Sequence, residues 1–152
     1  MFKDLIFIDV DGVLAVPNFG DYGVGMSDTE WLDFCVSKKD KAYENCGRLK
    51  SVVSYLIGAN ANHSQIYVLT AVGNSYEANA KRSFINSNYR NILFKEFVAV
   101  GSSEDKIAMI QSIARDVGKL LKDCLLVDDD FNLLLKAKES GINILHISNI
   151  VE

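Results

Sequence analysis

Proline is nearly absent from this chain, occurring once in 152 residues, and no segment is dominated by a few residue types. Collagen, linker-rich arrays and disordered proteins need such biased compositions, so the chain belongs to none of these classes. Its three cysteines, Cys35, Cys46 and Cys124, are an odd and widely spaced set. That spacing matches no metal-binding pattern, so we expect reduced thiols. The length is typical of a single domain with one sizeable core, and we find no internal repeat.

Long hydrophobic runs and an excess of basic residues are also missing. The longest uninterrupted apolar runs have four residues, far short of the roughly 20 that span a membrane. The N-terminus reads Met-Phe-Lys-Asp and does not have the pattern of a signal peptide, so we expect a cytoplasmic protein. The 16 basic and 20 acidic residues give a net charge of −4. This balance argues against binding nucleic acid through bulk charge, but leaves a nucleotide or a nucleic-acid end open as a substrate.

Five short apolar runs alternate with helical patterns along the chain. We expect strands at residues 5–8, 66–69, 97–100, 124–127 and 144–147. All five runs are continuously apolar, which is typical of strands that are covered on both faces in a parallel sheet. Between them, apolar residues at helical spacing predict helices near residues 49–57, 76–84, 107–117 and 131–141. The sequence therefore predicts a doubly wound (Rossmann-like) α/β fold, with about five parallel strands and helices on both faces.

Residues 12–47 interrupt this alternation. The segment is rich in glycine at first, and a short helix should begin at Ser27, a favourable N-cap with Glu30 three residues later. Loops of this length are uncommon in compact domains unless they are functional or disordered. We therefore expect a flap, or minimal cap, inserted into a single domain and lying over the carboxyl ends of the strands.

Three aromatic residues of this flap, Phe19, Tyr22 and Trp31, have two alternative roles. They could shape the substrate's leaving group by stacking on a base or a sugar. More often, such residues only pack a loop onto its domain.

Two acidic clusters follow predicted strands. Asp9 and Asp11 come directly after the first strand, and three consecutive aspartates, Asp128 to Asp130, come after the fourth. Ligands of open parallel sheets bind at the carboxyl ends of the strands, so the clusters can converge there. Carboxylates held close together repel one another unless a cation lies between them, and oxygen ligands favour Mg²⁺ over zinc. The alternative is that both clusters are solvated loop residues.

Four motifs, in order from Phe7 to about Asn132, resemble those of the haloacid dehalogenase-like (HAD) hydrolase superfamily. They are Asp9-Val10-Asp11-Gly12-Val13, a strand ending in Thr70, a helix opening with Lys106, and the pair Asp128-Asp129 after a strand. The resemblance implies an HAD-like core and a phosphatase. It also implies a nucleophile, Asp9, and a general acid and base, Asp11. Thr70 and Lys106 would bind the phosphoryl group, the first by hydrogen bonds and the second by its charge.

The resemblance also implies how Mg²⁺ is held: by a carboxylate oxygen of Asp9, the backbone carbonyl of Asp11 and an acidic residue of the last motif. Three consecutive aspartates leave open which of them matches the acidic residue of that motif. If the motif is the acidic pair Asp128-Asp129, the ligand is Asp129 and Asp128 supports it. Read with Asn132 as the partner, the ligand is Asp128. We prefer Asp129, and we expect Asp130 to be the N-cap of the next helix.

Other charged residues receive structural interpretations. Lys81 and Arg82 are rivals of Lys106 as the phosphate-binding cation, but we expect both on a solvated helix face, with Lys81 exposed beside Glu77. We assign no catalytic role to the two histidines, and expect His146 to be a satisfied core or edge residue and His63 to be solvated.

The sequence thus predicts a Mg²⁺-dependent phosphatase that hydrolyses a small phosphomonoester through an aspartyl-phosphate on Asp9. A dehalogenase of the same fold would lack Asp11. The remaining alternatives are a phosphomutase, and a binding or regulatory module that kept the fold and lost turnover. Residues 70–76 resemble those of phosphatases that act on nucleotides and nucleic-acid ends, but name no substrate. The oligomeric state also stays open.

Overall fold

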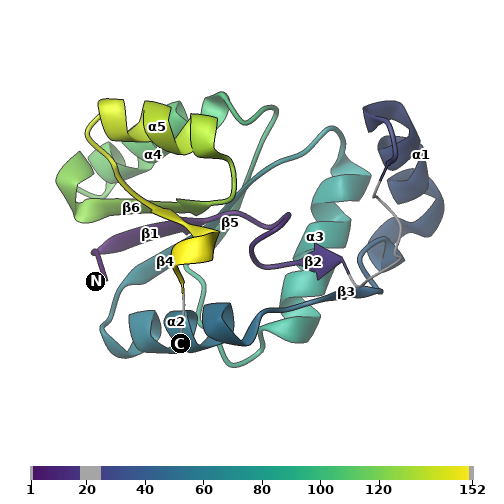
Figure 1. The fold of residues 1–152 in the computed structure, drawn as a ribbon, viewed down its shortest axis with the longest axis horizontal. Helices are drawn as coiled ribbons and strands as arrows, with labels where there is room; N and C mark the ends of the chain where they lie inside the picture. The colour runs from purple at the N-terminus through teal and green to yellow at the C-terminus, as the bar shows by residue number, and fades with distance from the viewer. Residues whose placement is uncertain (1, 18–24, 151–152) are drawn as a thin grey trace.

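A computed structural model describes residues 2–17 and 25–150 of the chain. Five parallel strands form the central sheet in the order β5-β4-β1-β6-β7. Figure 1 shows this sheet in the middle of the domain. Their bounds are β1 Leu5–Ile8, β4 Gln65–Ala71, β5 Glu96–Val100, β6 Cys124–Asp128 and β7 Asn143–His146. The predicted doubly wound α/β fold is therefore confirmed. Only β7 is displaced from its predicted range, because Ile147 already begins a short 3-10 helix that the side chain of His146 caps.

Helices cover both faces of this sheet (Figure 1). Alternate residues of β1 point to opposite faces, so Ile6 and Ile8 pack with α2 (Lys50–Ala61) and α3 (Ser75–Asn88). Leu5 and Phe7 pack on the other side with α4 (Asp105–Asp116) and α5 (Phe131–Glu139). This burial on both faces explains why the strand sequences are continuously apolar.

The segment between β1 and α2 is more structured than the sequence indicated. Helix α1 (Asp28–Lys38) begins as predicted, since the hydroxyl of Ser27 accepts a hydrogen bond from the amide of Glu30. A 3-10 helix, η1 (Lys39–Lys41), follows it. The two-residue strands β2 (Val16–Pro17) and β3 (Cys46–Gly47) pair antiparallel at the base of the segment. Such short strands carry no periodic pattern, so the sequence could not predict them. Phe19 and Tyr22 lie outside the described residues.

Helices α1 and η1 pack against α3 (Figure 1). The indole of Trp31 stacks on Phe34 and meets the ring of Tyr43 edge-on, and its N–H donates to Glu77 of α3 at 2.8 Å. Leu32 lies against Gly73, in the loop between β4 and α3. Trp31 therefore packs the inserted segment onto the domain, which is the commoner of the two roles expected for it.

Within the described part of the chain, no helix combines the length and the apolar character that crossing a membrane requires.

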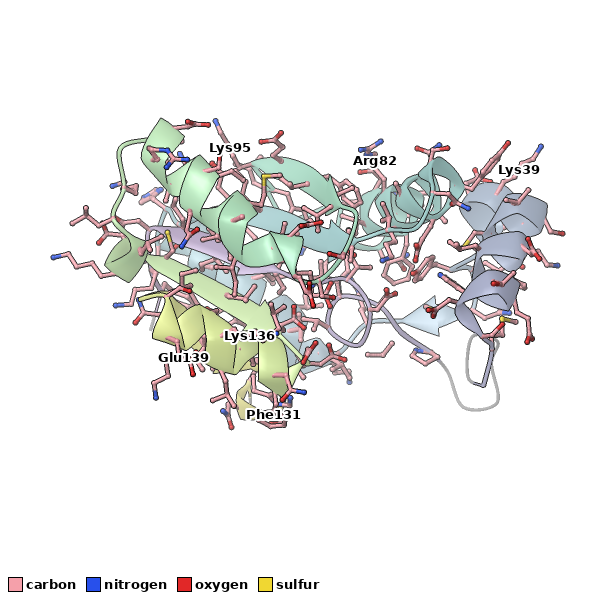
Figure 2. The ribbon with its side chains drawn as sticks, turned by 90° about the horizontal axis from the view of Figure 1, so that it is seen from above. Lys39, Arg82, Lys95, Phe131, Lys136 and Glu139 are labelled. Atoms are coloured by element: carbon pink, nitrogen blue, oxygen red, sulfur yellow. The ribbon has the colours of Figure 1, made fainter. Side chains whose placement is uncertain are left out.

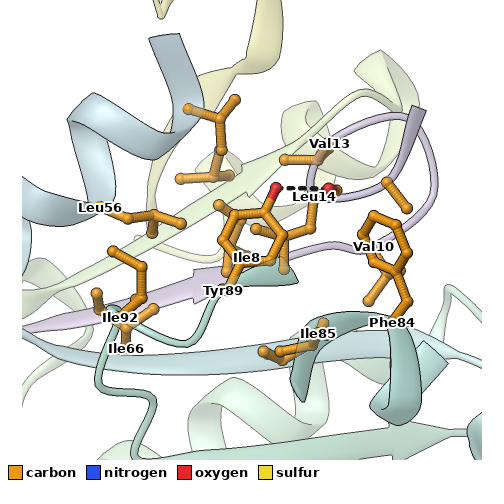
Figure 3. Close-up of a cluster of buried hydrophobic side chains, with 14 of the residues drawn as sticks. Ile8, Val10, Val13, Leu14, Leu56, Ile66, Phe84, Ile85, Tyr89 and Ile92 are labelled. Atoms are coloured by element: carbon orange, nitrogen blue, oxygen red, sulfur yellow. Dashed lines mark hydrogen bonds between the residues drawn. The ribbon is translucent and has the colours of Figure 1, made fainter. Parts of the chain in front are cut away.

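The buried hydroxyl of Tyr89 provides a test of the core. It donates to the carbonyl of Leu14 at 2.5 Å, linking the end of α3 to the loop after β1 (Figure 3). We expect Tyr89→Phe to lower the free energy of unfolding by about 1–3 kcal/mol, because a buried carbonyl loses its partner. Tyr55→Phe is the matched control, since the buried hydroxyl of Tyr55 has no hydrogen-bond partner among the described residues. Urea denaturation should separate the two variants, and equal stability losses would contradict this account.

Candidate active site

The carboxyl ends of β1 and β6 bring three carboxylates together. The two strands pair in register, and the ladder continues one residue further where the amide of Asp9 donates to the carbonyl of Val127 at 3.1 Å. Asp9 and Asp128 are buried, whereas Asp129 is exposed. One carboxylate oxygen from each of these three residues lies within 4.8 Å of the other two. The two acidic clusters of the sequence thus converge at one edge of the sheet.

Lys106 joins this group from the first turn of α4. Its buried ammonium lies 3.1 Å from Oδ1 of Asp9 and 2.8 Å from Oδ2 of Asp128. Burial lowers the pKa of Lys106, but the two carboxylates raise it by more than burial lowers it. The pKa of Lys106 is therefore above its ordinary value. Because an ammonium has three N–H donors, these contacts leave one donor for another acceptor in the pocket.

Asp128 and Asp129 differ in how their carboxylates are used. Oδ1 of Asp128 accepts from the amides of Asp129 and Asp130 at 2.8 and 3.0 Å, while Oδ2 accepts from Lys106. Both oxygens of Asp128 therefore have partners. The carboxylate of Asp129 lies against Gly12, where a Cβ atom would be only 2.2 Å from its Oδ2. Gly12 has φ +76°, and it leaves the space that lets Asp129 approach the loop after β1.

Asp11 is not part of the three-carboxylate group; its half-exposed carboxylate is held from two other elements. Tyr43, from the inserted segment, donates its hydroxyl to Oδ1 of Asp11 at 2.6 Å. The ammonium of Lys81, from α3, lies 2.9 Å from Oδ2. Burial and the charge of Asp11 raise the pKa of Tyr43 well above its ordinary value, so the hydroxyl stays protonated and is a donor.

The expectation that Lys81 lies on a solvated helix face is wrong. Lys81 is completely buried, and its ammonium donates to Oγ1 of Thr70 and the carbonyl of Ala71, both at 2.8 Å. Glu77 is buried as well and lies 3.5 Å away, so the pair is not exposed either. Helix α3 can turn this charged face toward β4 because the ammonium finds partners there. Thr70 and Ala71 accept hydrogen bonds from it, and the carboxylate of Asp11 neutralises its charge. Arg82, on the neighbouring face, is exposed as expected (Figure 2).

Glu77 connects Lys81 to the inserted segment. Its Oε1 accepts from the amide of Gly73 at 2.7 Å, and its Oε2 accepts from the indole of Trp31 at 2.8 Å. One carboxylate therefore ties together α3, the loop after β4 and α1.

Burial, together with the charges of Asp128 and Asp11, raises the pKa of Asp9 to about 7, against the lowering effect of Lys106 and Lys81. Burial and Asp128 also raise the pKa of Asp129. The protein on its own therefore disfavours a full set of negative charges at this edge of the sheet.

A pocket of about 210 Å³ opens on these groups. Its walls come from the ends of β1, β4 and β6 and the start of α4, and consist of Asp9, Asp11, Thr70, Ala71, Ser103, Lys106, Asp128, Asp129 and Asp130. All six residues assigned to the site from the sequence line this pocket. The sequence did not indicate Tyr43 or Glu77, and its prediction for Lys81 was wrong. Tyr43 and Lys81 contact Asp11, and Glu77 contacts Lys81.

The remaining sequence expectations concern residues around the last motif. Asp130 caps α5 as expected, accepting from the amides of Asn132 and Leu133. His146, at the end of β7, is half-buried; its Nδ1 accepts from the amide of Ser148 and its Nε2 lies 3.1 Å from the carbonyl of Asp129. It is thus a satisfied edge residue that also contacts the backbone of the acidic cluster. His63 is exposed.

Comparison with solved structures shows the fold. A haloacid dehalogenase-like family hydrolase from Streptococcus pneumoniae has a TM-score of 0.60 at 14% identity, covering 95% of this chain and 84% of its own. D,D-heptose 1,7-bisphosphate phosphatase from Burkholderia thailandensis has a TM-score of 0.57 at 15% identity, over 92% and 75% of the two chains. The chain therefore has the HAD-like fold.

A third similar structure is 3-deoxy-D-manno-octulosonate 8-phosphate phosphatase from Moraxella catarrhalis, in complex with magnesium, phosphate and KDO. It has a TM-score of 0.53 at 15% identity, and the alignment covers 89% of this chain and 62% of that one. No family model matches the sequence, and no curated protein matches it either.

Gly12 offers a test of how the site is built. We expect Gly12→Ala to cost about 1–2 kcal/mol of stability for its left-handed conformation, and also to displace the carboxylate of Asp129. Gly118→Ala is the matched control, with φ +72° and nothing within 4 Å of the added carbon. Thermal denaturation should give similar losses for both variants, while a crystal structure should show the carboxylate of Asp129 displaced in Gly12→Ala alone. An unmoved carboxylate in Gly12→Ala would show that Asp129 does not depend on this space.

Proposed function

We propose that the protein is a Mg²⁺-dependent phosphatase that hydrolyses a small phosphomonoester through an aspartyl-phosphate on Asp9. The observation that carries this proposal is the convergence of the carboxylates of Asp9, Asp128 and Asp129, with the buried ammonium of Lys106 in contact with the first two. A buried carboxylate beside a cation, facing a pocket with further donors, is the arrangement that nucleophilic attack on phosphorus requires.

The donor set fits Mg²⁺. Carboxylate and carbonyl oxygens are the ligands it prefers, and the carboxylates of Asp9 and Asp129 come within 4.8 Å of each other. Asp129 is the better candidate than Asp128, because both oxygens of Asp128 are already engaged by Lys106 and two backbone amides. We assign the metal to Asp9, Asp129 and the backbone carbonyl of Asp11, with Asp128 as the support of Lys106. When bound, Mg²⁺ would neutralise phosphoryl oxygens and lower their repulsion toward Asp9.

Lys106 and Thr70 are suited to bind the transferred phosphoryl group. Lys106 retains one donor for a phosphoryl oxygen after its contacts with Asp9 and Asp128. Oγ1 of Thr70 accepts from Lys81, so its own O–H proton is free to be donated into the pocket. Lys81, by contrast, already makes three short contacts, with Thr70, Ala71 and Asp11, so Lys106 is the phosphate-binding cation in this proposal.

The two steps of the reaction divide between Asp9 and Asp11. An oxygen of Asp9 attacks phosphorus, and the bond to the leaving oxygen breaks as Asp11 gives that oxygen a proton. Asp11, now ionised, then takes a proton from the water that attacks the aspartyl-phosphate, which releases phosphate and restores Asp9.

The pocket's volume of about 210 Å³ suits a phosphoryl group and little more, so the rest of the substrate would extend outward. Two of the similar structures are, by name, phosphatases of phosphorylated sugars. We therefore propose a small phosphorylated molecule and would screen sugar phosphates first. A nucleotide or a nucleic-acid end has no comparable support.

Metal dependence and loss of the nucleophile test the proposal together. We expect p-nitrophenyl phosphate hydrolysis in the presence of Mg²⁺, its abolition by EDTA with recovery on added Mg²⁺, and no turnover in Asp9→Asn. A binding module would leave both chains inert. A phosphomutase would move phosphate within a substrate in preference to releasing it, which phosphate release assays distinguish. Full activity of Asp9→Asn would exclude the covalent route.

Separate substitutions of the two neighbouring aspartates test their division of labour. Asp129→Asn should weaken Mg²⁺ binding and leave the melting temperature nearly unchanged, because this exposed side chain has few structural partners. Asp128→Asn should lower the free energy of unfolding by about 3–5 kcal/mol, because it removes one partner of a buried charge pair. Calorimetric titration with Mg²⁺ and urea denaturation give the two readouts. The reverse pattern would assign the metal to Asp128.

A further inference from the structure

We infer that Tyr43 of the inserted segment and Lys81 of α3 are positioning residues that hold the carboxylate of Asp11, so that the insert serves proton transfer. This inference rests on the proposed function and goes beyond it, since that proposal gives neither residue a direct contact with metal or phosphate.

The two contacts on Asp11 come from different parts of the chain and reach different oxygens of its carboxylate. Tyr43 donates to Oδ1 at 2.6 Å and Lys81 donates to Oδ2 at 2.9 Å. Each oxygen of the carboxylate therefore has its own donor, which fixes both the position of the group and its rotation. This matters because half of the Asp11 side chain is exposed, and an unheld carboxylate at the end of a strand would sample several rotamers.

Both holding groups are themselves immobile. Tyr43 and Lys81 are almost completely buried. The ammonium of Lys81 is fixed by Thr70 and the carbonyl of Ala71, each at 2.8 Å. The ring of Tyr43 packs against Trp31 and Phe84. Proton transfer is sensitive to donor placement, so rigid partners are what a working acid and base requires.

The wider network connects the insert to the same point. Trp31 of α1 donates to Glu77, and Glu77 lies 3.5 Å from Lys81. Displacing the insert from α3 would therefore disturb Tyr43 directly and Lys81 through Glu77. In this arrangement the insert acts on the acid and base, in addition to any contact it makes with a leaving group.

The experiment compares Tyr43→Phe with the native protein on phenyl phosphate and p-nitrophenyl phosphate. The two esters have nearly the same shape, but nitrophenolate leaves readily without a proton, whereas phenolate needs one. We expect kcat/KM for phenyl phosphate to fall roughly ten-fold in Tyr43→Phe, and kcat/KM for p-nitrophenyl phosphate to change little. A burst of nitrophenol in the first turnover should appear in this variant, because hydrolysis of the aspartyl-phosphate also uses Asp11.

Two controls separate positioning from stability. Tyr89→Phe removes a comparable buried hydroxyl contact that is made to the carbonyl of Leu14 and not to Asp11, so it should lower stability without changing the ratio of the two substrates. In an Asp11→Asn background, Tyr43→Phe should have no further effect on either ester, because Tyr43 acts only through Asp11. Lys81→Gln, if it folds, should also lose more activity on phenyl phosphate than on p-nitrophenyl phosphate. If it does not fold, the result for Tyr43→Phe decides whether the inference holds.

Equal losses on both esters that follow a lower melting temperature, or additive effects in the Asp11→Asn background, would overturn the inference and leave the proposed phosphatase intact. A native protein without activity on either ester would overturn the proposed function, and the inference with it.

Discussion

The burial of the Lys106 ammonium between Asp9 and Asp128 is the interaction on which the site depends. An unpaired charge in this position would be strongly destabilising, so the carboxylates that end β1 and β6 must lie beside α4. This pairing also places the neighbouring residues. Asp128 accepts hydrogen bonds from the amides of Asp129 and Asp130, and the side chain of Asp129 then lies against Gly12. The geometry of the acidic cluster therefore follows from neutralising one cation in a parallel sheet, whose strands all end at the same edge.

A second buried cation, Lys81, organises the other half of the site in the same way. It faces the end of β4, where Thr70 and Ala71 accept hydrogen bonds from it, and it also contacts the carboxylate of Asp11. The two lysines differ in what they leave free. Lys106 keeps one N–H donor for a group in the pocket. All three donors of Lys81 contact other residues of the protein, and the bond to Oγ1 of Thr70 orients the hydroxyl of that residue. One cation thus suits substrate binding and the other suits holding the residues around it.

The sequence predicted the fold because its strands are buried on both faces, which leaves short continuous apolar runs such as those of β1 and β6. It predicted that Asp9, Asp11, Asp128 and Asp129 converge because they follow such runs, whereas Thr70 and Lys106 were assigned to the site through the resemblance of their motifs. Tyr43 was not predictable in this way, since it lies in an insert without periodicity and reaches Asp11 only through tertiary packing. Lys81 was misjudged because Glu77 and Lys81 have the spacing of an exposed ion pair. Their helical face also carries Phe84, three residues after Lys81, and this was the available signal that the pair could be buried.

Charge balance links these two halves to the proposed chemistry. Asp9, Asp128 and Asp129 can carry three negative charges against the single charge of Lys106. Burial in the first place, and the charge of Asp128 in addition, raise the pKa of Asp9 against the lowering effect of Lys106. A divalent cation would balance the remaining two charges, which is why the donor set favours Mg²⁺ over a further lysine. The carboxylate of Asp11 does not enter this charge balance, because Lys81 and Tyr43 are its partners. In the proposed reaction, Asp11 would therefore exchange a proton with a leaving group or with water without disturbing the carboxylates that would hold the metal. This separation suits the proposed division between a nucleophile and an acid that are two residues apart.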